Sequence, residues 1–240
     1  YYIIEVNTSE LTAENYQAAK MAIDSFHVVY RKKVELRKKA DILSDTIDLR
    51  ESRKNISYLN SILPEKIKRL NELKQNFNLT EYEKQAGPGI YQHKNHDAVA
   101  NANRNYIHSY FDENGLLYLV SDYTGKNIRH NQLQLSTGDL SVSTGALSSG
   151  NYYNVQGEHF EKLSVGDSAA INLIEFIVAN QNQNLKVALK GNGGFSYNLQ
   201  QNDKRIIAET YEFWKLKTET DKINKELTRA NKRIQIIELK

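Results

Sequence analysis

The most constraining feature of this 240-residue chain is its C-terminal segment, residues 203–240, which contains neither glycine nor proline. Apolar residues recur along it in steps of three and four, the spacing of one face of an α-helix. Such a helix would extend about 55 Å, whereas a β-rich region of about 110 residues is only about 30 Å across, so we expect it to pair with another helix. Asn202 or Asp203 is the expected N-cap. The apolar seam consists of Phe213, Leu216, Thr220, Ile223, Leu227, Ala230, Ile234 and Ile237.

The expected partner lies in the N-terminal region, residues 9–86, which has a helical pattern with Thr8 or Ser9 as its cap. Pro64 lies inside this region, and because proline is poorly tolerated in a helix interior, we predict a break or kink near 60–64, with Ser61 capping the next helix. The second seam consists of Ile56, Leu59, Leu63, Lys66, Leu70, Leu73 and Phe77.

The two seams predict an antiparallel coiled-coil stalk within one chain. In this arrangement Phe77 lies near Phe213 and Ile56 lies near Ile234. Pairing between two copies of the chain is the alternative, so self-association through the coiled coil is a possible partner mode.

Residues 87–201 differ from both flanks because they hold nearly all of the glycine. Asn114-Gly115 between two apolar runs predicts a β-hairpin. A helix capped by Asp167 or Ser168 is expected to pack on a sheet and to end at the amide-rich run 180–184, whose side chains compete for backbone hydrogen bonds. We therefore predict an α+β fold with a small antiparallel β-rich head between two stalk segments, with boundaries at 1–86, 87–201 and 202–240. The expected strands, which form a meander, are 106–111, 116–120, 127–135, 140–143, 152–155, 159–163, 185–190 and 195–199.

The glycine-rich stretch 190–196, Lys-Gly-Asn-Gly-Gly-Phe-Ser, raises the question of a phosphate-binding loop. Such loops lead from a strand into a helix, and the residues that follow here read as a strand instead. We predict a hairpin turn in which the glycines supply positive φ angles.

The segment 91–97 contains His93, His96 and Asp97, a candidate metal site to which His108, His130 or His159 could add a further ligand. The spacing matches no established zinc motif, and a polar surface loop is the favoured interpretation, so we expect no metal and no other cofactor.

The tyrosines Tyr106, Tyr110, Tyr118, Tyr152 and Tyr153 are candidate binding residues, although cross-strand packing is favoured for them. Trp214 is expected to be a packing anchor. No serine lies in a Gly-x-Ser-x-Gly motif. Glu158 and Glu161 flank His159, but neighbouring residues on a strand point to opposite faces, so we predict no catalytic triad there.

Six cations lie in Arg31-Lys32-Lys33 and Arg37-Lys38-Lys39, with Glu35 as the one acid among them. They could meet lipid phosphates or nucleic acid, but a solvated helix face is the favoured interpretation. The net charge of only +3 does not demand nucleic acid as a partner, and the absence of cysteine excludes disulfides and thiolate sites.

The function we expect is that of a non-enzymatic structural or binding protein, in which a helical stalk presents the β-rich head to a protein partner. The alternatives are a small metal-binding or catalytic head that uses the His93/His96 loop, and a membrane-active helical protein that inserts residues 171–178. The chain begins Tyr-Tyr-Ile-Ile-Glu-Val without an initiator methionine, so we expect a processed or trimmed chain. An upstream anchor would provide the membrane contact and favour the extracytoplasmic cell envelope over the cytoplasm.

Overall fold

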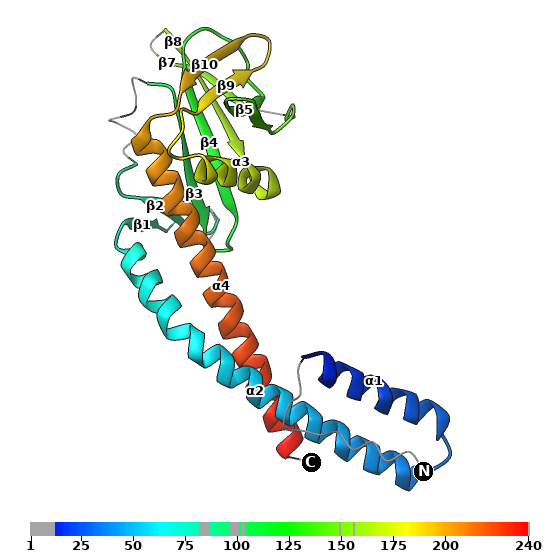
Figure 1. Ribbon diagram of the computed structural model, residues 1–240. Coiled ribbons are helices and arrows are strands. Elements are labelled where there is room, and N and C mark those ends of the chain that lie inside the picture. Colours follow the sequence, from blue (N-terminus) through cyan, green and yellow to red (C-terminus); the bar gives the residue numbers. More distant parts are fainter. Residues whose placement is uncertain are drawn as a thin grey trace. The chain divides into compact units, whose positions relative to one another are not determined.

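The computed structural model describes residues 13–81, 87–96, 101, 104–148, 150–155 and 157–239. The fold is α+β, as predicted, with long helices and two antiparallel sheets (Figure 1). The helices are α1 Ala13–Val29, α2 Val34–Lys74, α3 Asp167–Ala179 and α4 Gln201–Glu238. The strands are β1 Phe77–Thr80, β2 Ile90–His93, β3 Tyr106–Asp112, β4 Leu117–Thr124, β5 Gln132–Thr137, β6 Leu140–Ser143, β7 Asn151–Val155, β8 Glu158–Val165, β9 Lys186–Lys190 and β10 Gly194–Asn198.

The chain forms two compact units, and both boundaries between them fall inside helices, in α2 and in α4. The helical unit comprises the described residues of 1–66 and 220–240. The mixed unit comprises residues 67–219, which include every strand and α3.

The mixed unit contains a six-stranded sheet of order β1-β2-β3-β4-β8-β7 and a four-stranded sheet of order β10-β9-β5-β6. The predicted hairpin is confirmed: β3 and β4 pair with Tyr110 opposite Tyr118, and Gly115 in the turn has a φ of +85°. The strands do not form a single meander, because β4 pairs with β8 and β5 pairs with β9 across long connections.

Helix α3 packs on strands of both sheets, as Figure 1 shows, and it buries Leu173, Ile174 and Ile177. Its N-cap is Gly166 without a side-chain cap, so the predicted capping by Asp167 or Ser168 is wrong. The helix ends where expected. There the side-chain amide of Asn180 donates to the carbonyl of Phe176 and competes with the backbone hydrogen bonds of the helix.

Pairing of the helices within one chain is seen in both units. In the mixed unit the end of α2 and the start of α4 are antiparallel. Arg69 pairs with Glu212, and Asn76, further along the chain, pairs with Glu209, which comes earlier on α4. Phe77 meets Phe213 with ring centroids 4.6 Å apart, as predicted. The residues of both predicted seams are all buried or half-buried, which is what interhelical packing requires.

Helix α2 continues through Pro64, so the first predicted alternative, a break at 60–64, is wrong. Proline has no N–H group, so the carbonyl of Asn60, four positions earlier, loses its helical partner. Both Pro64 and Asn60 are exposed, and water can therefore bond to this carbonyl. Ser61 is not a cap, because its hydroxyl donates to the carbonyl of Tyr58 inside the helix at 2.7 Å.

Other boundaries in the N-terminal half also differ from the prediction. Residues 30–33 form a turn that separates α1 from α2, so the basic run does not lie on one helix. Phe77 belongs to strand β1, and the 91–93 segment belongs to strand β2 and not to a loop. At the other end of the chain, α4 begins at Gln201, so Asn202 and Asp203 lie in its first turn and not at its cap.

The glycine-rich stretch is a hairpin turn between β9 and β10, as predicted. The prediction that its glycines supply positive φ angles is wrong. Gly191, Gly193 and Gly194 do not have positive φ angles. A Cβ at Gly191 would lie 2.1 Å from the carbonyl oxygen of Arg129, and one at Gly193 would lie 3.0 Å from the Ile128 side chain. The glycines therefore permit close approach to the segment 128–129.

Candidate functional site

The candidate metal ligands do not all come together in the mixed unit. His93 is buried on β2, and its Nε2 lies 2.9 Å from Glu209 Oε2 on α4. His130 belongs to a different cluster, and Asp97 lies outside the described residues. Among the described residues, no group of three metal-ligating side chains converges.

His96 and His108 do come together, with their rings stacked at a centroid distance of 4.0 Å. His108 Nε2 lies 3.0 Å from Asp122 Oδ2, and the other carboxylate oxygen of Asp122 meets Lys162 Nζ at 3.1 Å. Burial, with repulsion from His108, lowers the pKa of His96 to about 4, so His96 is neutral at pH 7. Among the residues that the structure describes, the buried Nδ1 of His108 has no hydrogen-bond partner.

A hydrogen-bonded chain that links Ser121, His130 and Glu161 was not predicted. Ser121 Oγ lies 2.7 Å from His130 Nε2, and His130 Nδ1 lies 2.6 Å from Glu161 Oε2. Because an ionised carboxylate only accepts hydrogen bonds, His130 carries its proton on Nδ1 and accepts from the serine hydroxyl at Nε2. This is the order of groups in a serine hydrolase triad.

The surroundings of this chain differ from those of a catalytic centre. Ser121 and His130 are fully buried, and neither lines a described cavity. Glu161 accepts from five donors: the backbone N–H groups of residues 128, 129 and 130, the ring of His130 and the ring of His159. Burial alone would raise the pKa of Glu161, but these hydrogen bonds lower it to about 2. The carboxylate thus fixes the segment 128–130 to strand β8.

His159 and Glu161 are in contact at 2.9 Å, so the argument that a strand separates them was wrong. Alternation separates neighbours, but residues two apart on a strand share a face. This spacing was the one signal in the sequence that could have indicated part of the cluster.

The candidate tyrosines mostly pack on neighbouring strands, which was the favoured interpretation. Tyr106 is buried beside Arg104, and Tyr110 stacks on Tyr118 at 4.9 Å. Tyr152 and Tyr153 on the edge strand β7 are exposed, although Tyr153 stacks on Phe160. Trp214 anchors α4, because its indole N–H donates to the carbonyl of Gly115 at 2.7 Å.

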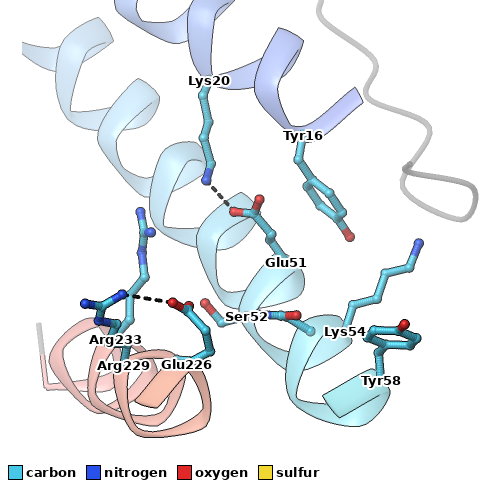
Figure 2. Close-up of a pocket in the computed structure, with 11 residues that line it drawn as sticks. Tyr16, Lys20, Glu51, Ser52, Lys54, Tyr58, Glu226, Arg229 and Arg233 are labelled. Atoms are coloured by element: carbon cyan, nitrogen blue, oxygen red, sulfur yellow. Dashed lines mark hydrogen bonds and ion pairs between the residues drawn. The ribbon is translucent and has the colours of Figure 1, made fainter. Parts of the chain in front are cut away.

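A cavity of about 640 Å³ lies in the helical unit, where α1, α2 and α4 form a groove (Figure 2). This volume is within the range of ligand-binding pockets. Four cations, two carboxylates and two tyrosines contribute to its walls. The lining residues are Tyr16, Lys20, Glu51, Ser52, Lys54, Asn55, Tyr58, Glu226, Arg229, Ala230 and Arg233.

Ion pairs around Asp48 hold the three helices of the groove together. Lys20 of α1 lies 2.8 Å from Asp48 Oδ1 and also pairs with Glu51, while Arg233 of α4 pairs with Asp48 Oδ2. Burial disfavours the charged forms, but the hydrogen bonds between these groups lower the pKa of Asp48 and raise that of Lys20. A nearby apolar cluster of Tyr16, Ile23 and Ile47 also packs α1 on α2.

The rim of the groove is more open than this ion cluster. Among the described residues, Glu226 is the one carboxylate paired with Arg229, at 2.8 Å and three positions away on α4, and the Arg229 side chain is 75% exposed. In Figure 2, Arg229 and Arg233 lie next to each other on α4, while Lys54 and Tyr58 extend from the opposite side of α2. Exposed pairs of this kind are weak, so Arg229 can exchange Glu226 for the carboxylate of a ligand at little cost.

Comparisons with known proteins add no family: no family model, curated protein or solved structure matches this chain.

Proposed function

We propose that this chain is a non-enzymatic binding protein whose helical unit binds an acidic segment of another protein in the α1/α2/α4 groove. The groove itself is the observation that carries this proposal. It combines an adequate volume with guanidinium groups, which recognise carboxylates through paired hydrogen bonds. The tyrosines provide apolar surface with a polar end, as is common at protein-binding sites.

The charges of the groove favour an acidic ligand over a basic one. Its lining carries Lys20, Lys54, Arg229 and Arg233 against two carboxylates. Glu51 is occupied by Lys20, and the remaining acid, Glu226, is the partner of Arg229. A lysine-rich segment would have to compete with these internal cations for both carboxylates, whereas an acidic segment adds partners for the arginines.

The stalk-and-head function expected from the sequence fits into this proposal in a modified form. The paired helices provide the structural part and also the binding groove. The proposed role of the mixed unit as a further contact surface rests on the exposed Tyr152 and Tyr153 of strand β7.

Fluorescence anisotropy with a fluorescein-labelled octapeptide of alternating glutamate and leucine tests the groove, with a lysine–leucine octapeptide as comparator. We expect saturable binding of the acidic peptide only. Replacing Arg229 by alanine removes a cation from the groove and should raise the dissociation constant about tenfold, the effect of one charge-assisted hydrogen bond.

Arg53→Ala is the matched control, because Arg53 is also an exposed arginine of the helical unit with one carboxylate partner, Glu238, and it does not line the groove. It should change the dissociation constant less than twofold. Equal effects of the two substitutions, or equal binding of both peptides, would show that the groove is not the binding site.

A second candidate function is metal binding at His96 and His108, and the unpartnered His108 Nδ1 is the observation that favours it. Asp122 holds the opposite nitrogen of that ring, as a carboxylate does behind many metal-bound histidines. Metal analysis of protein purified without a histidine tag tests this candidate. Stoichiometric zinc that is lost in both His96→Ala and His108→Ala would support it and would replace the purely structural interpretation of the mixed unit.

A further inference from the structure

The turn between α1 and α2 exposes apolar side chains. Val29 at the end of α1 is 71% exposed, and Val34 at the start of α2 is 61% exposed. Val28, Tyr30 and Leu36 are also exposed, so five large apolar residues face solvent within nine positions. Isolated exposed apolar residues are ordinary, but a concentration of them at one turn indicates a contact surface.

Cations occupy the same turn. Arg31, Lys32 and Lys33 lie between the two helices, and Arg37, Lys38 and Lys39 follow in the first turns of α2. All six are exposed. Among the described residues, only Lys38 of these six has a carboxylate partner, Glu35 at 3.3 Å. We call residues 28–39 the hairpin tip.

The geometry of the hairpin tip explains why the solvated-face interpretation of the basic run is insufficient. On one continuous helix, the cations would have alternated with core-facing positions. The turn at 30–33 instead places three cations directly between the exposed valines, at the end of a pair of helices that lie side by side (Figure 1). The tip is therefore apolar and cationic at the same place.

We propose that the hairpin tip binds the surface of an anionic lipid bilayer, with the valines and Tyr30 among the headgroups and the cations on lipid phosphates. Membrane-surface segments combine basic and apolar side chains in this way, and tyrosine favours the interface. Clusters of four to eight cations are typical of recognition of anionic lipids. Among the described residues, no helix combines the length and the apolar character of a membrane span. The contact that we infer is with the bilayer surface. It does not depend on the groove, which lies elsewhere on the helical unit.

Co-sedimentation of the full chain with vesicles tests this inference, using phosphatidylcholine alone and phosphatidylcholine with 30% phosphatidylserine as probes. We expect binding to the anionic vesicles that weakens as salt is raised, and little binding to the neutral ones. Replacing Arg31, Lys32 and Lys33 together by serine should lower the partition coefficient roughly 100-fold, because each cation contributes a factor of about five.

The matched control replaces Lys215, Lys222 and Lys225 of α4 by serine, since these lysines are exposed and the net charge changes equally. It should leave the partition coefficient within about threefold, which allows for the loss of nonspecific attraction. A second pair of variants tests the apolar contribution. Val29→Ser should weaken binding several-fold, and Leu140→Ser, at another exposed apolar residue, on β6, should not.

Equal losses in the two serine triples would overturn the proposal, because binding would then follow net charge alone. Failure of the unaltered chain to bind anionic vesicles would overturn it as well. Concentration-dependent self-association in sedimentation velocity that disappears in Val29→Ser, without vesicle binding, would assign the tip to contact between copies of the chain instead.

Discussion

The Glu161 carboxylate provides the sharpest test of how the mixed unit is held together. Glu161→Gln keeps the size of the side chain but replaces one acceptor oxygen with a donor NH₂ group. Oε1 faces the N–H groups of Ile128 and Arg129 and the ring of His159, and Oε2 faces two donors of His130. In either orientation of the glutamine side chain, its NH₂ group therefore faces at least two N–H donors. Those donors lose the oxygen that accepted their hydrogen bonds.

The expected cost can be worked out from the pKa. Glu161 is fully buried, and lowering its pKa from 4.5 to about 2 on folding corresponds to about 3 kcal/mol of stability at pH 7. Because the pKa in the folded state is the lower one, this contribution is complete above about pH 4.5 and is lost as the pH falls toward 2. Glu161→Gln should thus lower the free energy of unfolding by about 3 kcal/mol at neutral pH, and by less in acid.

Urea unfolding followed by the fluorescence of Trp214 is a suitable assay, since this is the only tryptophan and it lies in the mixed unit. The stability difference between the two proteins should shrink between pH 5 and pH 2.5. Glu158→Gln, at an exposed glutamate of the same strand, should stay within about 0.5 kcal/mol of the unaltered chain at all of these pH values. A pH-independent difference for Glu161→Gln would refute the reasoning from the ionised carboxylate.

Three further outcomes are expected. Gly191→Ala should destabilise the mixed unit by about 2 kcal/mol or more because its Cβ would meet backbone, whereas Gly194→Ala, with the nearest atom at 3.7 Å, should cost less than about 1 kcal/mol in the same urea assay. Asp48→Asn should loosen α1 and speed its removal by limited proteolysis at pH 7. The difference in cleavage rate between the variant and the unaltered chain should narrow as acid protonates Asp48, whose pKa is lowered in the folded state. A fluorophosphonate probe should not label Ser121 in the folded protein because its hydroxyl is fully buried, and labelling would establish access to a hydrolase-like centre.

Most of the regular structure could be predicted because its signals are local. The β3–β4 hairpin follows from Asn114-Gly115 between two apolar runs, and α3 follows from its wide apolar face and the amide-rich segment after it. The contact of Phe77 with Phe213 could be predicted from the matching lengths of the two seams.

The errors arose where tertiary contacts override local preference. Pro64 ends an isolated helix, but here α2 is held on both sides of it and continues. Phe77 fits the helical seam by spacing, yet it begins a strand because β2 offers it a partner in His93. The glycines at 191 and 193 read as a turn with positive φ, and only the neighbouring segment 128–129 reveals that they are needed for space.

Tertiary contacts also create the polar cluster of Ser121, His130 and Glu161. Ser121 and Glu161 lie on paired strands, in register with Leu163 and Tyr123 respectively, and His130 reaches them from a connecting segment. No short motif encodes such an arrangement. A catalytic carboxylate mainly orients its histidine, whereas Glu161 also takes three backbone N–H groups and a second imidazole. The donors that most lower its pKa belong to the segment 128–130. We therefore infer that the cluster fixes this segment, against which the glycine turn of β9 and β10 then packs, and that its resemblance to a triad follows from the hydrogen bonds that a buried histidine needs.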